Sequence, residues 1–140
     1  MKKKVRVFVN SAQQYDDFSD QITTNALGEY THNRNQHIIT YTEKMEGDAI
    51  VNNVLTLKKE GAELQRSGAV SSVMKFDVGA TTETFYGNQY GQLDFKVCTT
   101  RYDVVINEDK INVFLHYDMF MNSQRVSRNI LQISIDYLKD

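Results

Sequence analysis

Arg66 is the residue whose position points most directly to chemistry. Alternation along its strand puts it on the same face as neighbouring apolar side chains, so its charge is expected to face inward. Because arginine is almost never fully buried without a partner, two interpretations stay open. Arg66 pairs with an inward carboxylate, Glu43 or Glu83, helped by Asn53, or its guanidinium binds a ligand carboxylate or phosphate through two hydrogen bonds.

Five tyrosines share the inward face predicted for Arg66, and their hydroxyls need hydrogen-bond partners if they are buried. They either reach the ends of a filled core or line a cavity with mixed polar and apolar walls, which is typical of small-molecule sites. The five are Tyr30, Tyr41, Tyr102, Tyr117 and Tyr137.

The three histidines do not indicate a metal centre or a catalytic site. His32 and His37 are expected to face each other across a turn, but zinc normally takes a third protein ligand and the pattern supplies none. His116 shares a strand face with Asp118, as a general-base pair could, yet no serine or cysteine nucleophile motif accompanies them. We therefore expect exposed polar residues, no metal and no cofactor, and an enzyme is the least favoured of three functional hypotheses.

The composition indicates one globular domain over residues 1–140. The net charge of −2, from 16 basic and 18 acidic residues, argues against a nucleic-acid partner or a basic membrane-binding face. No run of about 18 apolar residues is present, and the apolar run after Lys2 to Lys4 is too short for a signal peptide. The lone Cys98 can form no internal disulfide and is expected to be inert. These features predict a cytoplasmic protein.

Residue types favour β-strands. Val, Ile and Thr number 33 against 14 Ala and Leu, and Tyr and Phe add 15 residues that suit pleated surfaces. Proline is absent, so the turns depend on Gly, Asn, Asp and Ser. Clusters of these residues recur about every ten positions, as is typical of all-β folds.

Alternation predicts the register of the last two strands. Odd-numbered residues are apolar in residues 110–121 and again in residues 131–137. A connection at residues 122–124 sets Leu115 opposite Leu131, which places both apolar rows on one face.

Turn chemistry extends this register to earlier strands. A turn centred on Gly47 sets Tyr41 opposite Asn53. A turn at residues 34–35 sets Gly28 opposite Tyr41, where a ring can cover the bare backbone.

The middle of the chain gives less uniform predictions. A two-residue turn at Glu60-Gly61 pairs Leu57 with Leu64. Matching parity on both sides of Gly68 favours one long strand that bends there. A change of phase before Tyr102 requires a bulge near residues 99–101.

The pattern leaves the inward face of one segment open and predicts a local structure for another. Residues 81–87 can turn either Thr82, Thr84 and Tyr86 or Glu83 and Phe85 inward. Residues 11–19 are expected to form a short helix or a loop before the next strand, because Ser11 and Gln14 have capping-box spacing.

Nine or ten short antiparallel strands without a long helix leave two architectures, a sandwich or a closed barrel. Closure removes exposed strand edges, and strands joined in chain order favour an up-and-down arrangement. We therefore predict an all-β fold, an antiparallel up-and-down β-barrel with at most one short helix.

Several segments resemble the YwiB family of small bacterial proteins, in the same order and at similar spacing. The most specific are Arg66-Ser67-Gly68-Ala69-Val70 and Tyr117-Asp118-Met119, and residues 41–43, 79–80 and 90–93 also match. The resemblance covers nearly the whole chain and implies a calycin-like, lipocalin-type barrel in the cytoplasm. It implies no activity, since the family has no known function and offers no catalytic residues to transfer.

The preferred functional hypothesis is a barrel that binds a small apolar or amphipathic molecule in its lumen. Arg66 and Tyr41 would engage the polar end of this molecule. Glu43, Asn53 and Tyr117 complete the set of expected ligand-binding residues.

The alternative is a filled barrel that serves as a protein interaction module and binds no small molecule. In that case Phe114 and Phe120, expected to be exposed beside His116, would form the contact patch. The same face could pack against a second copy of the chain.

Overall fold

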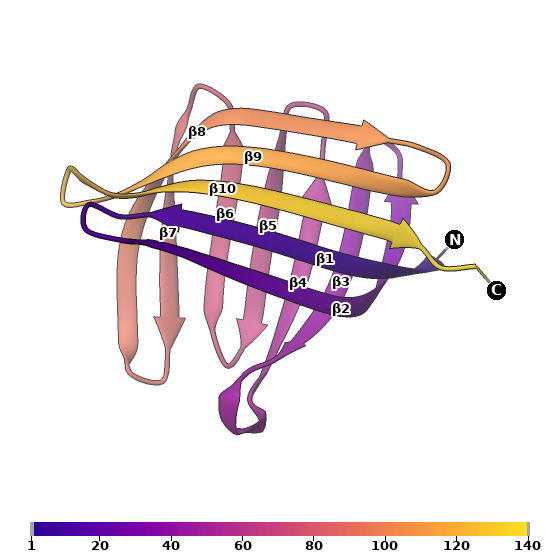
Figure 1. Cartoon of the computed structure of the whole chain (residues 1–140), viewed down its shortest axis with the longest axis horizontal. Coiled ribbons are helices and arrows are strands. Elements are labelled where there is room, and N and C mark those ends of the chain that lie inside the picture. Colours follow the sequence, from indigo (N-terminus) through magenta and orange to yellow (C-terminus); the bar gives the residue numbers. More distant parts are fainter. Residues whose placement is uncertain (1, 140) are drawn as a thin grey trace.

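The computed structural model describes residues 2–139, which form a closed barrel of ten antiparallel strands (Figure 1). Every strand is hydrogen-bonded to its neighbours in the chain, and β1 pairs with β10 to close the barrel. This confirms the predicted up-and-down β-barrel. The strands are β1 (Lys2–Gln14), β2 (Ser19–Asn33), β3 (Gln36–Lys44), β4 (Ile50–Leu57), β5 (Gly61–Gly68), β6 (Ser71–Asp77), β7 (Thr81–Asn88), β8 (Gly91–Ile106), β9 (Lys110–Met121) and β10 (Gln124–Tyr137).

The barrel is flattened into two layers that cross at a steep angle. Strands β8, β9, β10, β1 and β2 form the layer in front, and β3 to β7 form the layer behind (Figure 1). The only helical element in the described part of the chain is the 3₁₀ turn η1 (Glu46–Asp48) between β3 and β4. Among residues 2–139 there is no helix with the length and apolar character needed to span a bilayer.

The predicted register of β9 and β10 is confirmed, because Leu115 lies opposite Leu131. The connection differs in detail from the prediction. It is a two-residue turn at Asn122 and Ser123, both with positive φ, and a bulge at Val126 restores the phase. The apolar rows of the two strands therefore both face the lumen.

The predicted registers of β2, β3 and β4 are also confirmed. Tyr41 lies opposite Asn53 on one side and Gly28 on the other. A Cβ atom added at Gly28 would approach the Thr40 carbonyl oxygen to 2.3 Å, so the close approach of β2 and β3 requires glycine there. The predicted bulge in β8 is present between Thr99 and Arg101.

The prediction of one strand bent at Gly68 is wrong, because β5 and β6 form a hairpin in which Arg66 pairs with Ser72. Gly68 adopts a φ of 103°, and its neighbour Ala69 donates from its amide to the Ile50 carbonyl. A hairpin keeps the same inward parity on both strands as a bent strand does. Alternation therefore could not distinguish the two.

The predicted turn at Glu60-Gly61 is also shifted. The connection is residues 58–60, closed by a hydrogen bond from the Lys58 amide to the Gly61 carbonyl, and Leu57 pairs with Ala62 instead of Leu64. The register moves by two residues, so the predicted faces are kept.

Two further predictions concern residues 11–19 and 81–87. The short helix or loop expected over residues 11–19 does not span that range, because residues 5–14 of β1 pair with strands on both sides and only residues 15–18 form a turn. In β7 the open choice is resolved: Thr84 is buried with Thr82 and Tyr86 half-buried on the same face, whereas Glu83 and Phe85 are exposed.

The lumen has an apolar half and a polar half. The apolar half lies toward the end of the barrel that holds both chain termini, and includes Val5, Ile39, Leu55, Phe76, Leu115 and Ile135, all fully buried. The polar half lies toward the end formed by the β1–β2, β3–β4, β5–β6, β7–β8 and β9–β10 turns. Its buried polar residues are Asn53, Ser72, Thr84, Thr99, Ser127 and Asn129.

Candidate ligand-binding site in the barrel lumen

Arg66 lies in the polar half of the lumen and contacts two side chains from neighbouring strands. Its Nε donates to Oδ1 of Asn53 at 3.2 Å, and its Nη2 lies 3.5 Å from Oε1 of Glu43. The pairing of β3 with β4 and of β4 with β5 brings the three residues together, since Asn53 lies directly between Tyr41 and Arg66.

Asn53 organises this group. It is only 2% exposed, and its Nδ2 donates to Oε1 of Glu43 at 2.8 Å and more weakly to the Tyr41 carbonyl at 3.4 Å. One amide therefore bridges the guanidinium and the carboxylate. We refer to Tyr41, Glu43, Asn53 and Arg66 as the arginine cluster.

The arginine cluster carries balanced charge and still reaches solvent. The side chains of Arg66 and Glu43 are 23% and 18% exposed, so neither is sealed in the core. The two contacts of Arg66 involve Nε and Nη2, which leaves Nη1 outside both. The cluster thus combines a cationic donor, an anionic acceptor and an amide at one place in the wall.

Tyr41 adds a neutral hydroxyl to the cluster. Burial raises the pKa of Tyr41 far above its usual range, the charge of Glu43 raises it further, and Arg66 opposes both. Tyr41 therefore stays protonated at physiological pH and remains able to donate a hydrogen bond.

The ion pair that the sequence offered as one interpretation of Arg66 is present, and its partner is Glu43. Glu83 is exposed on the outer face of β7 and does not face the lumen, so it is not the partner. A bound ligand at Arg66 stays a prediction.

Tyr117, the fifth expected site residue, belongs to a different part of the wall. It lies on β9, where its ring packs against Phe76 at a centroid distance of 4.9 Å. Burial raises the pKa of Tyr117 to about 12, with a smaller contribution from Tyr15 in the β1–β2 turn. The structure therefore brings four of the five predicted residues together and places the fifth elsewhere.

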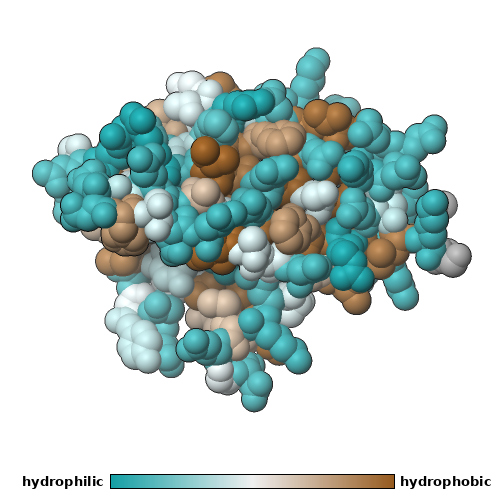
Figure 2. Space-filling view, viewed as in Figure 1, coloured by the Kyte–Doolittle hydropathy of each residue, from teal (hydrophilic) through white to brown (hydrophobic). Residues whose placement is uncertain are grey.

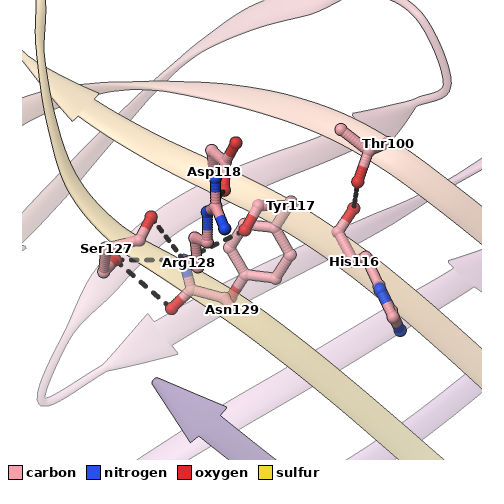
Figure 3. Close-up of polar contacts among 7 residues, drawn as sticks. All are labelled: Thr100, His116, Tyr117, Asp118, Ser127, Arg128 and Asn129. Atoms are coloured by element: carbon pink, nitrogen blue, oxygen red, sulfur yellow. Dashed lines mark hydrogen bonds and ion pairs between the residues drawn. The ribbon is translucent and has the colours of Figure 1, made fainter. Parts of the chain in front are cut away.

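A second group of buried polar residues surrounds Tyr117. Nδ2 of Asn129 donates to Oγ of Ser127 at 3.0 Å and to the Tyr117 carbonyl at 3.3 Å (Figure 3). Thr99, opposite Tyr117 on β8, is 1% exposed, and its Oγ1 has no hydrogen-bond partner among the described residues. Buried hydroxyls normally have a partner, so this atom marks an unsatisfied place in the lumen wall.

Sequence comparison identifies the family. The family model described as "Domain of unknown function (DUF1934)" matches residues 7–133, which include both polar groups. The chain belongs to the DUF1934 family. It is 27% identical over 124 residues to the "Uncharacterized beta-barrel protein YwiB" of Bacillus subtilis (strain 168), with 86% of this chain and 84% of the relative covered.

The fold of this DUF1934 chain is also that of a solved structure. It matches "Crystal structure of ywiB protein from Bacillus subtilis" with a TM-score of 0.88 and 22% identity, over 99% of this chain and 94% of that one. The resemblance to the YwiB family is therefore confirmed. These matches establish the barrel and the family, and they assign no activity.

The outer face of the DUF1934 barrel carries a shallow trough of about 890 Å³ across β2, β1, β10 and β9, lined in part by His116, Asp118 and Arg128. Asp118 lies 4.0 Å from Nε of Arg128, whereas the imidazole of His116 points away from the Asp118 carboxylate (Figure 3). Oγ1 of Thr100 donates to the backbone carbonyl of His116 at 3.2 Å, and not to its imidazole. This arrangement does not form a general-base pair.

Sequence reasoning missed the group around Asn129, although a signal was available. Ser127 and Asn129 share the parity of Leu131 and Ile133 and so continue the inward row of β10. The predicted inward row of β10 comprised only its apolar residues, from Leu131 onward.

Proposed function

We propose that this protein binds a small apolar or amphipathic molecule in the barrel lumen, with the polar end of the molecule at the arginine cluster. Arg66 and Tyr41 would donate hydrogen bonds to it, and Glu43 and Asn53 would hold Arg66 in place. The proposal includes a calycin-like, lipocalin-type barrel and a cytoplasmic location, which both stay predictions from the sequence.

One observation carries the proposal: a partly solvated ion pair is kept on the inward face of a barrel wall. Replacing an inward ion pair with apolar residues is often neutral or stabilising, so stability alone gives little reason to keep one. A guanidinium with donors still outside its protein contacts is suited to a ligand carboxylate or phosphate. A hydrocarbon portion would have to lie among the side chains of the apolar half, which form one buried cluster.

The test uses decanoate, which joins a carboxylate to an apolar chain, and decanol as its uncharged counterpart. We expect decanoate to shift the amide resonances of Tyr41, Asn53 and Arg66. Arg66→Gln should weaken decanoate binding by roughly tenfold or more, as the loss of a charge-assisted hydrogen bond implies, and should leave decanol binding unchanged. Arg101→Gln is the matched control, because Arg101 pairs with Asp103 on the outer face.

Equal binding of decanoate to wild type and Arg66→Gln would reject the role of Arg66. Native mass spectrometry of the purified protein adds an independent readout, since a retained small molecule released on denaturation supports lumen binding. Failure of both experiments would leave the filled barrel as the better account.

The filled barrel has an observation of its own, the complete burial of large side chains such as Phe76 and Leu115 in the apolar half. Its expected contact patch needs correction, because Phe114 and Phe120 are half-buried and Arg101 lies 5.9 Å from the Phe114 ring centroid. Phe8 and Ile130 are exposed. Figure 2 shows that the apolar side chains visible on this face lie among polar ones. Concentration-dependent dimerisation that is lost in Ile130→Ser would favour this alternative.

A further inference from the structure

A second pocket, of about 850 Å³, lies at the other end of the barrel, beside the turns β2–β3 and β4–β5 and the end of β8. These turns are near each other at the end that also holds the chain termini (Figure 1). Five basic side chains line it: His32, Arg34, His37, Lys58 and Lys59. We refer to it as the histidine pocket.

His32 and His37 form a stacked pair in the histidine pocket. They are opposite each other in the register of β2 and β3, and their rings lie 4.5 Å apart with an interplanar angle of 4°. The hydroxyl of Tyr30 lies 2.7 Å from Nδ1 of His37. Burial raises the pKa of Tyr30 to about 12, so its hydroxyl stays protonated. It donates to Nδ1 when neutral His37 carries its proton on Nε2, and it accepts from Nδ1 when His37 is protonated on both nitrogens.

His37 resists protonation in the free protein. Burial lowers the pKa of His37 below its ordinary value, and the neighbouring charge of His32 lowers it further. Two parallel imidazolium rings at this centroid distance would repel each other. An anion in the pocket would supply a counter-charge.

The charges around the pair are mostly positive. Arg34, Lys58 and Lys59 face two carboxylates, Glu60 and Asp103, so the lining carries +1 while both histidines are neutral and +3 when both are protonated. Asp103 is already held by Arg101, with Nε to Oδ2 at 2.5 Å.

Among residues 2–139, no carboxylate of the other elements forms an ion pair with either histidine. Behind Tyr30, the Tyr137 ring of β10 packs edge-on at 5.4 Å, and Lys3 of β1 lies 5.1 Å from the centre of that ring. The Tyr102 hydroxyl of β8 donates to the Lys58 carbonyl at 2.6 Å and fixes the β4–β5 turn. Glu29, the nearest acid on β2, lies on its outer face and pairs with Lys2.

We propose that the histidine pocket binds an oxyanion, such as sulfate or a phosphate group, with an affinity that rises as the two histidines take up protons. Lys58, Lys59 and Arg34 would supply permanent positive charge, and the histidines would add donors when protonated. The proposal is independent of ligand binding in the polar half of the lumen.

The direction of the pH dependence follows from linkage. An anion stabilises the charged histidines and raises their pKa in the complex above that of the free protein. Affinity therefore increases as the pH falls through the pKa of the complex. It reaches its limit below the pKa of the free protein. If the anion raises the pKa of one histidine by about 1, binding becomes about tenfold tighter at low pH.

The experiment follows the three histidine Cε1–H resonances while sodium sulfate is added at constant ionic strength. Sulfate is the probe because its charge does not change between pH 5.5 and 8. We expect binding about tenfold tighter at pH 5.5 than at pH 8, with shifts at His32 and His37. His116, on the outer trough, should not shift and serves as an internal control.

Two variants separate the parts of the site. His32→Gln with His37→Gln should remove the pH dependence, and Lys58→Gln with Lys59→Gln should weaken binding at both pH values. The lysine variant also keeps the test decisive if the histidine variant fails to fold, because both lysines are exposed turn residues. Glycerol phosphate is the second probe. It should bind more tightly than sulfate if the pocket takes an organic phosphate, and no more tightly than sulfate if the pocket takes a free oxyanion.

Equal shifts of all three histidines would overturn the proposal, because they would indicate non-specific association. Equal affinity at both pH values, or unchanged affinity in the lysine variant, would do the same.

Discussion

At the scale of single residues, one buried amide, that of Asn53, sets the positions of the charged side chains in the arginine cluster. Asn53 orients both Glu43 and Arg66, and the two charged side chains keep limited access to solvent. Removing one charge leaves the other on an inward face with an incomplete set of partners. Removing both takes away the need for partners.

Substitutions at Arg66 and Glu43 should therefore be strongly non-additive. Arg66→Met and Glu43→Leu should each lower the free energy of unfolding by roughly 1–3 kcal/mol, and the double variant should lose much less than the sum. Urea unfolding of all four proteins measures the coupling. The exposed pair Arg101 and Asp103 is the control, with a coupling of about 0–1 kcal/mol. Additive losses at Arg66 and Glu43 would show that their contact contributes nothing to stability.

At the scale of elements, the turn between β9 and β10 departs from the residue type that its geometry favours. Asn122 and Ser123 have φ values of 52° and 66°. Two central residues with positive φ are typical of a type I′ hairpin turn, whose preferred sequence is Asn-Gly. The second position therefore carries a side chain where glycine is favoured.

Ser123→Gly should stabilise the protein by about 0.5–1 kcal/mol, because glycine adopts positive φ without steric cost. The midpoint of thermal unfolding gives the measurement. Ser67→Gly is the matched control: Ser67 lies in an extended part of β5, so glycine there should destabilise by a similar amount. A loss of stability in Ser123→Gly would contradict the turn geometry.

The geometry of strand pairing also explains how much of the fold the sequence could predict. Alternation predicted the inward faces and the registers around Tyr41 and Leu115, because a slip by one residue would turn an apolar row outward. A slip by two residues preserves every face. The apolar pattern therefore fits both the predicted and the observed register at Glu60-Gly61. The hairpin at Gly68 was missed for the same reason.

The candidate site was predictable to the extent that it depends on register. Pairing of β3, β4 and β5 was enough to associate Arg66 with Glu43 and Asn53. The location of Tyr117 depends on how the two layers pack across the lumen, and strand pairing does not specify this. The stacking of His32 on His37 likewise depends on side-chain conformations that no periodicity encodes.

At the scale of the whole molecule, the barrel wall has one weak seam. Strands β6 and β7 share only two register pairs, Ser71 with Gly87 and Ser72 with Tyr86. Further along, two threonine hydroxyls of β7 contact β6: Thr82 Oγ1 donates to the Lys75 carbonyl at 2.7 Å, and Thr84 Oγ1 donates to the Val73 carbonyl. Side chains thus connect the strands where the backbone ladder is interrupted.

This seam should be the first part of the wall to open. Backbone amides of β6 and β7 that face each other should exchange with deuterium at least about tenfold faster than those between β8 and β9, since free energies of local opening vary across a structure. Replacing the threonines, in Thr82→Val with Thr84→Val, should accelerate exchange at β6 and β7 further. Thr23→Val, at an exposed position of β2, should have no effect there. Uniform protection around the barrel would show that the hydroxyl contacts fully replace the backbone ladder between β6 and β7. Slower exchange at this seam on adding decanoate would link the opening of the seam to entry into the lumen.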